Sequence, residues 1–476
     1  MSDHRLSRRG LLRLSALAGA GALLAACTPQ VVKETVVVQQ TVVVEKTKEV
    51  EKVVTSVPKP AEKVTLELWD WATDANDANL AAVKKSCAAF VERNPLIQVN
   101  VLHTPQANQT LEKLISSIAG NTAPDVAHVD MFTVVSWAAR LAFEDLTPLA
   151  EADKVDPVKE FYDWAVKEGS YRGRLYALAT VQSHQVFEWN KKHFRDAGLD
   201  PERPPKSAEE MWEYANKLDK KEGGKYTRIA FIPDMILEWA LAFFWAGCMK
   251  DAPADFNPFC DYKAMKCTVN DPKIVEALKW KLEWVKRYGV DELAGFRSSF
   301  GWAEQDPLGQ GLVSMQLSGT WVHDMLGKYF PDLEWGAGPT PVPEKYGGTS
   351  LSACVGPEGY SIPRGALAKG HLQQAWQYCK FVSGAEANMI IQKSGDWLPC
   401  RPDMMGDPWY KRTPQMEFFI SMLPCCWNRP TIPEGNLLWT TTIEAEDKAV
   451  HDKGEPQQLL DEVAKGVDEA MKQWTS

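Results

Sequence analysis

The sequence predicts an α/β protein with a largely parallel sheet and enough residues for two lobes. Strands alternate with helices from residue 64 onward, which is the pattern of βαβ units. The 476 residues exceed what a single hydrophobic core usually organises, so we expect two lobes. With 45% hydrophobic and 24% charged residues, the composition is that of a globular chain and not of a disordered one.

The first part of the folded body carries the clearest alternation. The predicted order is strand 64–69, helix 79–93, strand 97–102, helix 109–119 and strand 124–129. In parallel sheets, ligands bind beyond the carboxyl ends of the strands. The residues that follow two of these strands, Asp70-Trp71 and Asp130-Met131, are therefore candidate site residues.

Helices dominate the rest of the chain. We expect them at residues 208–218, 236–245, 273–288, 372–382 and 456–474. In the last of these, Leu460, Val463, Val467 and Met471 form one apolar stripe, so this helix should cover the core with one face.

The N-terminus reads as an export signal. Arg8 and Arg9 precede an apolar run over residues 11–26 that is too short and too rich in Ala and Gly for a membrane span. The paired arginines favour twin-arginine export. The run ends at Leu24-Ala25-Ala26-Cys27, which resembles a lipobox, so the Cys27 thiol would accept a diacylglyceryl group. The alternative is a signal cut elsewhere, with Cys27 lost or inert.

Residues 28–62 read as a spacer between a membrane anchor and the folded body. Twelve of these 35 residues are valine, ten are Lys or Glu, and there is neither glycine nor an aromatic residue. Nothing there could fill a core, and a heptad pattern is weak. We therefore assign residues 1–26 to the export signal and 27–62 to the anchor and spacer.

Charge and cysteines restrict the partners. The formal net charge is −10, and because residues 1–26 carry +3, the remainder carries −13. Nucleic acid is therefore not an expected partner. No C-x-x-C pair occurs, so we predict neither a metal site nor a cofactor. Cys248, Cys260 and Cys267 share a Pro- and Asp-rich loop that a disulfide could pin outside the cytoplasm.

Several motifs resemble the extracellular solute-binding family whose best-known member is maltose-binding protein. Each is weak alone, but they follow the family's order along most of the chain from Val64 to the end. They are Tyr171-Arg-Gly-Arg-Leu-Tyr-Ala-Leu178, Trp189-Asn-Lys191, Met315-Gln-Leu-Ser-Gly-Thr-Trp321, Ala375-Trp-Gln-Tyr-Cys-Lys-Phe381 and Ser394-Gly-Asp-Trp-Leu-Pro399. Ala179 departs from the pattern, because the family has proline there.

The resemblance implies a two-lobed periplasmic-binding-protein-like fold, each lobe a central sheet flanked by helices, with a ligand cleft between them. The N-terminal lobe would comprise 63–181 and about 358–398, and the C-terminal lobe 182–357 and about 399–476. Crossing segments would lie near 181–183, 356–359 and 398–401. The lobes would close on the solute by a hinge motion.

The resemblance also implies the function. The chain would be an exported, monomeric lipoprotein on the outer face of the cytoplasmic membrane. It would capture a mono- or oligosaccharide, deliver it to the membrane permease subunits of an ABC-type importer, and catalyse no reaction. Two alternatives stay open: an exported carbohydrate-active hydrolase, and a binder of another solute such as a peptide or polyamine. The sequence contains no G-x-S-x-G, H-E-x-x-H or phosphate-loop motif.

Tryptophan is abundant, with 19 residues, and sugars stack their C–H faces on flat aromatic rings. Most of these tryptophans should be structural; Trp280 and Trp284, four apart on one helix, are expected to pack. Trp321 matches a family tryptophan that often stacks on the sugar. The other aromatic candidates are Trp71, Trp239, Trp397 and Trp439.

Polar candidates lie after the strands and at the crossing segments. The Asp130 carboxylate could accept hydroxyl hydrogen bonds or, alternatively, cap the next helix. His184 lies at the first crossing, where the family's layout faces the cleft, but maltose-binding protein has an acidic residue close to this point. Glu358, Tyr360 and Arg401 lie at the other crossings, and Arg401 could instead be an ion-pair partner.

Overall fold

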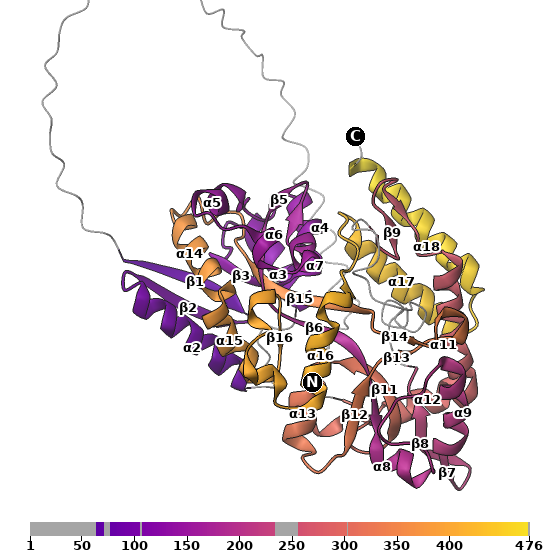
Figure 1. The fold of residues 1–476 in the computed structure, drawn as a ribbon. Helices are drawn as coiled ribbons and strands as arrows, with labels where there is room; N and C mark the ends of the chain where they lie inside the picture. Colours follow the sequence, from indigo (N-terminus) through magenta and orange to yellow (C-terminus); the bar gives the residue numbers. More distant parts are fainter. Residues whose placement is uncertain (1–62, 71–76, 105–106, 234–255, 302, 475–476) are drawn as a thin grey trace, which may run out of the picture. The chain divides into compact units, whose positions relative to one another are not determined.

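A computed structural model describes residues 63–70, 77–104, 107–233, 256–301 and 303–474 (Figure 1). The predicted export signal and spacer, with Cys27, lie outside these residues. So do Trp71, Trp239 and the predicted helix 236–245. Contacts group residues 61–476 into one compact unit, so the lobe boundaries given above stay a prediction.

The core of the fold is a mixed sheet in which, within the described residues, eleven strands are connected. Its strands are β1 (Val64–Asp70), β2 (Ile97–His103), β3 (Val126–Asp130), β6 (Ala177–Asn190), β7 (Lys220–Glu222), β8 (Lys225–Phe231), β11 (Val313–Gly319), β12 (Trp335–Gly338), β15 (Ala353–Ser361), β16 (Leu398–Pro399) and β17 (Cys426–Trp427). Three short ribbons lie apart from it: β4 (Ser170–Tyr171) with β5 (Arg174–Leu175), β9 (Cys260–Asp261) with β10 (Lys266–Cys267), and β13 (Thr340–Pro341) with β14 (Thr349–Ser350).

The main path of the sheet runs β2-β1-β3-β15-β6-β11-β8-β7. β1 is parallel to both β2 and β3, as the βαβ pattern predicted, and β8 is parallel to β11. β15 is antiparallel to β3 and β6, and β11 is antiparallel to β6. The predicted α/β class is confirmed, and the antiparallel strands make the sheet mixed.

β6 joins the two halves of this path. Its first half pairs with β15 and its second half with β11 and β12, while β16 pairs with Val181 and Gln182 at its centre. Every residue of β6 is buried. The register of β15 shifts between Glu358 and Gly359, where a Cβ on Gly359 would lie 2.3 Å from the Leu178 carbonyl oxygen. Glycine therefore permits the close approach of the two strands.

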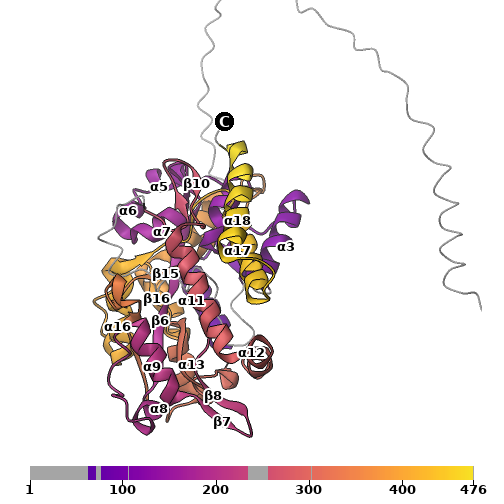
Figure 2. The ribbon, with the colours of Figure 1, turned by 90° about the vertical axis from the view of Figure 1, so that its right-hand side faces the viewer.

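Helices cover both parts of the sheet. They are α2 (Asp77–Arg93), α3 (Ala107–Ala119), α4 (Val134–Ala139), α5 (Thr147–Ala152), α6 (Pro157–Glu160), α7 (Asp163–Glu168), α8 (Lys191–Asp196), α9 (Ala208–Leu218), α11 (Pro272–Tyr288), α12 (Val290–Arg297), α13 (Val322–Tyr329), α14 (Leu372–Ser383), α15 (Ala385–Gly395), α16 (Pro414–Met422), α17 (Gly435–Val450) and α18 (Pro456–Met471). α2, α14 and α15 pack together beside β1, and α9 packs on β8. α11, α17 and α18 lie side by side (Figure 2).

Most predicted elements appear within a few residues of their expected ends. α9 has the predicted bounds, and α2, α11 and α14 begin or end one to two residues away. The predicted last helix is α18 followed by a short 3-10 turn, with Leu460, Val463, Val467 and Met471 buried on its inner face. None of the helices in the described ranges is both long and apolar enough to cross a bilayer.

The packing role of the tryptophan pair on α11 is confirmed. Trp284 is fully buried against Phe231, with ring centroids 5.2 Å apart, and Trp280 contacts the same two rings. Among the cysteines of the described residues, Cys425 is disulfide-bonded and seven are outside any disulfide, including Cys260 and Cys267. Cys248 lies outside the described residues.

Candidate functional site

The carboxyl end of β3 carries the first polar group of the site. The Asp130 carboxylate accepts a hydrogen bond from the Phe132 N–H at 3.2 Å and so caps the 3-10 turn η1 (Met131–Thr133). The Thr133 hydroxyl donates to the Asp130 carbonyl at 2.7 Å. These two bonds fix the turn of the chain after the strand. Asp130 is nevertheless 28% exposed at its side chain, so its carboxylate is within reach of solvent.

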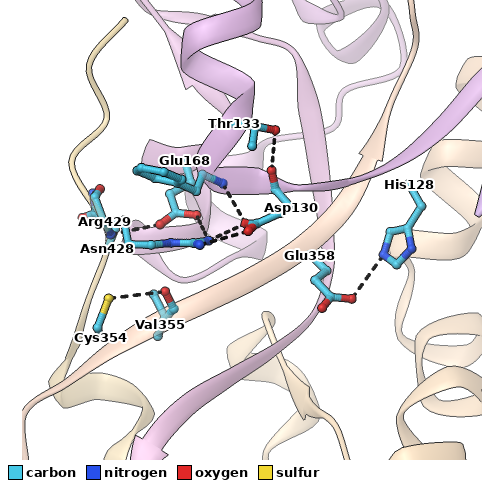
Figure 3. Close-up of polar contacts among 10 residues, drawn as sticks. His128, Asp130, Thr133, Glu168, Cys354, Val355, Glu358, Asn428 and Arg429 are labelled. Carbon is cyan, nitrogen blue, oxygen red and sulfur yellow. Dashed lines mark hydrogen bonds and ion pairs between the residues drawn. The ribbon is translucent and has the colours of Figure 1, made fainter. Parts of the chain in front are cut away.

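A buried arginine holds the other side of this carboxylate. Arg429 donates from Nη1 to Asp130 Oδ2 at 3.0 Å and from Nη2 to Oδ1, in a two-pronged ion pair (Figure 3). Its Nη2 and its backbone N–H also donate to the Glu168 carboxylate, at 3.3 and 3.0 Å. Such planar pairs combine charge with fixed geometry. Arg429 thus ties the segment after β17 to β3 and α7.

Burial and charge act against each other in this cluster. Burial opposes the charge on Arg429, but Asp130 and Glu168 more than offset it and hold the arginine pKa above its ordinary value. Glu168 is fully buried, and burial raises its pKa to about 7 despite the opposing effect of Arg429. One arginine therefore faces two carboxyl groups, of which Glu168 is fully buried.

A second charged cluster lies beside the first, and the two clusters share strand β3. His128 Nδ1 is 3.3 Å from Asp70 Oδ1, and its Nε2 is 3.4 Å from Glu358 Oε2. Burial lowers the pKa of His128, but the two carboxylates raise it to about 10, so the ring is an imidazolium at neutral pH. Figure 3 shows Glu358 and His128 turned toward each other, beside the Asp130–Arg429 pair.

Strand register explains why these groups meet. Asp130 lies opposite Glu358, and His128 lies opposite Tyr360, across the β3–β15 pair. Residues two apart on a strand share a face, so all four side chains belong to one face of the sheet. The Tyr360 ring stacks on His128 with centroids 4.9 Å apart, and its hydroxyl donates to Asp70 at 2.7 Å.

Aromatic rings border the Asp130–Arg429 pair. The Arg429 guanidinium lies 4.7 Å from the centre of the Phe132 ring, and Phe132 in turn contacts Trp439, with ring centroids 5.5 Å apart. Trp439 is half-buried on the second turn of α17. The site therefore combines a partly exposed carboxylate, a buried guanidinium and two aromatic rings. Groups of this kind hold a neutral, hydroxyl-rich ligand by hydrogen bonds and stacking.

Comparison with known proteins decides the family. The profile of the family described as "bacterial extracellular solute-binding protein" matches residues 85–417. The chain belongs to this family. The galactooligosaccharide-binding protein of Bacillus subtilis (strain 168) is 21% identical over 416 residues, which cover 87% of this chain and 91% of that protein.

Solved structures agree on the fold. One with mannotriose bound superimposes with a TM-score of 0.71 at 22% identity and covers 85% of this chain and 100% of its own. An ABC substrate-binding protein of Listeria monocytogenes in complex with cycloalternan superimposes with a TM-score of 0.70 at 20% identity, covering 86% and 100%. The two-lobed solute-binding fold is thereby confirmed, and the family's members are exported binding proteins.

The predicted polar residues of this solute-binding protein occupy three kinds of position. Asp130, Glu358 and Tyr360 meet on one face of the sheet, as described above. His184 is fully buried on β6, with its Nδ1 3.3 Å from Gln182 Nε2. Burial lowers the His184 pKa to about 3, so the ring is neutral. Arg401 contacts Glu160 and Asp403 at 2.8 and 2.9 Å, which is the ion-pair role considered for it.

Three of the five predicted tryptophans, Trp321, Trp397 and Trp439, lie within the described residues. Trp321 follows β11, half-buried, with its indole directly over Gly319, where a Cβ would be 1.8 Å from the ring. Trp397 lies in the same way over Gly395, just before β16. Glycine at each position therefore leaves room for the indole against the backbone. Ligand contact by Trp321, Trp397 and Trp439 stays a prediction.

Sequence reasoning missed several groups that complete this site. Arg429, Glu168 and His128 were not candidates, and Asp70 was considered only for its place after a strand. Their signal in the sequence is faint, since a lone histidine in an apolar strand or an arginine before a proline has no distinctive spacing. Within the described ranges, no group of three or more His, Cys, Asp or Glu is arranged to hold a metal ion.

A separate cavity of about 540 Å³ opens between α11, α12 and α17. Its walls are mostly apolar, with Val285, Leu293 and Ile443 among them, and the buried Lys281–Glu446 ion pair lies at its side. None of the predicted ligand residues in the described part of the chain lines it. Ile443 lies one helical turn beyond Trp439 on α17.

Proposed function

We propose that this solute-binding protein captures a carbohydrate, as a mono- or oligosaccharide, and delivers it to the permease subunits of an ABC importer. The observation that carries the proposal is the Asp130–Arg429 pair bordered by Phe132 and Trp439. Solved relatives with mannotriose and cycloalternan bound support it. Closure of the two lobes around the sugar would then present the loaded form to the importer.

The chemistry of the pair suits a polyol. Asp130 accepts two bonds from Arg429 and one from Phe132, and a carboxylate offers about four acceptor positions, so one hydroxyl donor can still be bound. Because Arg429 neutralises much of the carboxylate's charge, a neutral ligand is favoured over a cationic one. Trp439, and by family resemblance Trp321, would supply the stacking faces.

We further propose that the mature chain is monomeric and anchored to the membrane through Cys27, with residues 28–62 as its spacer. The lipobox-like Leu24-Ala25-Ala26-Cys27 and the paired Arg8 and Arg9 support this proposal. One acyl chain gives only marginal membrane binding, so a lipid group with two or more chains is expected.

We propose no hydrolytic activity. Asp130 and Glu358 lie opposite each other across two strands, but each carboxylate is already engaged by a cation, Arg429 or His128. Neither is therefore available as an unpaired acid or base. Incubating the protein with the oligosaccharides that bind it, and finding newly released reducing ends, would contradict this part.

A thermal-shift screen tests the solute class. A ligand that binds only the folded protein raises the melting temperature, by an amount that grows with the ratio of its concentration to Kd. The purified protein is screened against carbohydrates and, in parallel, against peptides and polyamines. We expect a carbohydrate to raise the melting temperature. A shift produced by a polyamine or peptide and by no carbohydrate would overturn the proposal.

Variants then test the site. With the best carbohydrate, Asp130→Asn should weaken binding by about 1.5–3 kcal/mol, or roughly 10- to 150-fold, because a charge-assisted hydrogen bond is lost. Asp196→Asn, on the exposed surface of α8, makes the same chemical change and should leave affinity unchanged. Calorimetric titration with melting curves of both variants separates lost binding from lost folding. Equal affinities of the two variants would remove Asp130 from the site.

A further inference from the structure

Two cysteines of the β9–β10 hairpin face each other directly. Cys260 and Cys267 are partners in the antiparallel register, and each side chain is 2% exposed. The Thr268 N–H donates to the Phe259 carbonyl at 2.9 Å, which makes 259 and 268 the hydrogen-bonded pair of the ladder. The next pair, Cys260 and Cys267, is therefore the non-hydrogen-bonded one, in which Cα atoms are about 4.5 Å apart. This separation lies within the range that a disulfide spans.

The hairpin supports the loop that carries Arg429. Asn257 Nδ2 donates to the Asn428 carbonyl at 2.9 Å, just before the arginine. The Thr431 N–H donates to the Tyr262 hydroxyl at 2.9 Å, just after it. Phe259 contacts the Trp427 ring, with centroids 6.0 Å apart. Three side chains of the hairpin thus fix both ends of this loop.

Cys260 and Cys267 are both thiols in this structure. We propose that they are oxidised to a cross-strand disulfide in the exported protein, and that this bond keeps the hairpin in the shape that positions Arg429. The part that concerns Arg429 rests on the proposed function. The two thiols lose two protons and two electrons, one S–S bond forms, and the electrons reduce the disulfide of a thiol–disulfide exchange partner outside the cytoplasm to a dithiol.

Burial determines when the bond forms. It raises the pKa of both Cys260 and Cys267 to about 12, so within the folded protein neither is a thiolate at neutral pH. Thiolates are the species that exchange with disulfides. The bond therefore forms while the hairpin is open, and the same burial then shields it from reductants.

Peptide mapping of the unmodified protein decides whether the disulfide exists. The exported protein is recovered from the membrane fraction with detergent, denatured with an alkylating agent present, and digested with trypsin without reduction. Trypsin cleaves after Lys263 and Lys266, which lie between the two cysteines. Cys260 therefore falls on peptide 251–263 and Cys267 on peptide 267–273. We expect these peptides joined, at their summed mass less two hydrogens. Both peptides in alkylated form would overturn the proposal. Peptide 370–380, with the free and buried Cys379, should be alkylated and serves as the internal control.

Function and stability test the positioning role. The bond closes a short loop, so its reduction should lower Tm by about 3 °C in a chain of this size. Because Cys425 is also disulfide-bonded, the effect of reductant on the parent is compared with its effect on the Cys260→Ala/Cys267→Ala double variant. The same double variant should bind the screened carbohydrate several-fold more weakly. If the peptides are joined but the double variant binds the carbohydrate as tightly as the parent, the disulfide exists and its role in positioning Arg429 is overturned. If the parent protein binds no carbohydrate, the proposed function is contradicted, but the peptide map still decides whether the disulfide exists.

Discussion

His128 should make the stability of the protein fall as the pH rises above neutrality. The folded protein holds its imidazolium between Asp70 and Glu358, with a pKa of about 10 against an ordinary value of 6.5. Below pH 6.5 both the folded and the unfolded chain carry the proton, so this stabilisation is fully present. Between pH 6.5 and about 10 the folded chain keeps a proton that the unfolded chain has lost. The free energy of unfolding therefore falls by up to about 1.4 kcal/mol per pH unit.

His128→Gln isolates this effect, because glutamine can donate a hydrogen bond but does not titrate. The control is His193→Gln. His193 is also buried and hydrogen-bonded, to Ser314 at 3.0 Å, but burial and nearby Arg228 lower its pKa to about 3. Its proton is absent in both states above pH 6.5, so it contributes no slope there.

The assay is urea denaturation at half-unit steps from pH 7.5 to pH 10, where the unfolded chain has lost nearly all of its histidine protons, with the free energy of unfolding extrapolated at each pH. The difference between the parent and His128→Gln should shrink steadily as the pH rises, whereas the difference between the parent and His193→Gln should stay constant. A difference for His128→Gln that is independent of pH would show that the folded protein does not hold this proton, and the charge assignment of the cluster would be wrong.

Two further predictions concern the predicted stacking residue and the anchor. Trp321→Ala should weaken carbohydrate binding by about 2–4 kcal/mol with little loss of stability, whereas Trp284→Ala should lower the free energy of unfolding by about 3–5 kcal/mol. Titration calorimetry and melting curves measure both, and a Trp321→Ala variant that binds like the parent would reject stacking. Cys27→Ala should release the protein from the membrane fraction, as followed by fractionation and immunoblotting, and unchanged association would reject the lipid anchor.

Local patterns sufficed for the first βαβ units and for the long helices. Strands β1, β2 and β3 alternate or concentrate apolar residues over five to seven positions and are separated by amphipathic segments. Ser207 caps α9 through a hydrogen bond to the Glu210 N–H at 3.1 Å, which is a start signal readable from sequence. Such elements are specified by neighbours along the chain, so a single sequence reveals them.

The long strand β6 shows where local patterns fail. Its 14 residues are all buried, yet they include Gln182, His184 and Glu188. Polar residues of this kind are normally expected on the surface when only the sequence is known. Gln182 and His184 contact each other within the strand, and Glu188 accepts a hydrogen bond from Gln316 of β11 at 2.7 Å. Burial of such groups follows from the tertiary fold, so the strand could not be predicted from the sequence.

The site divides in the same way. Asp130 could be predicted because strand ends gather at the ligand edge of a parallel sheet, a rule that needs no knowledge of the partner. Arg429 could not, because it reaches Asp130 across 299 positions of the chain. Arg429 is buried and also pairs with Glu168, so removing it would leave both carboxyl groups without their cation. Selectivity for the solute should accordingly depend on how its hydroxyls fit this fixed pair, since the pair's own charges already balance each other.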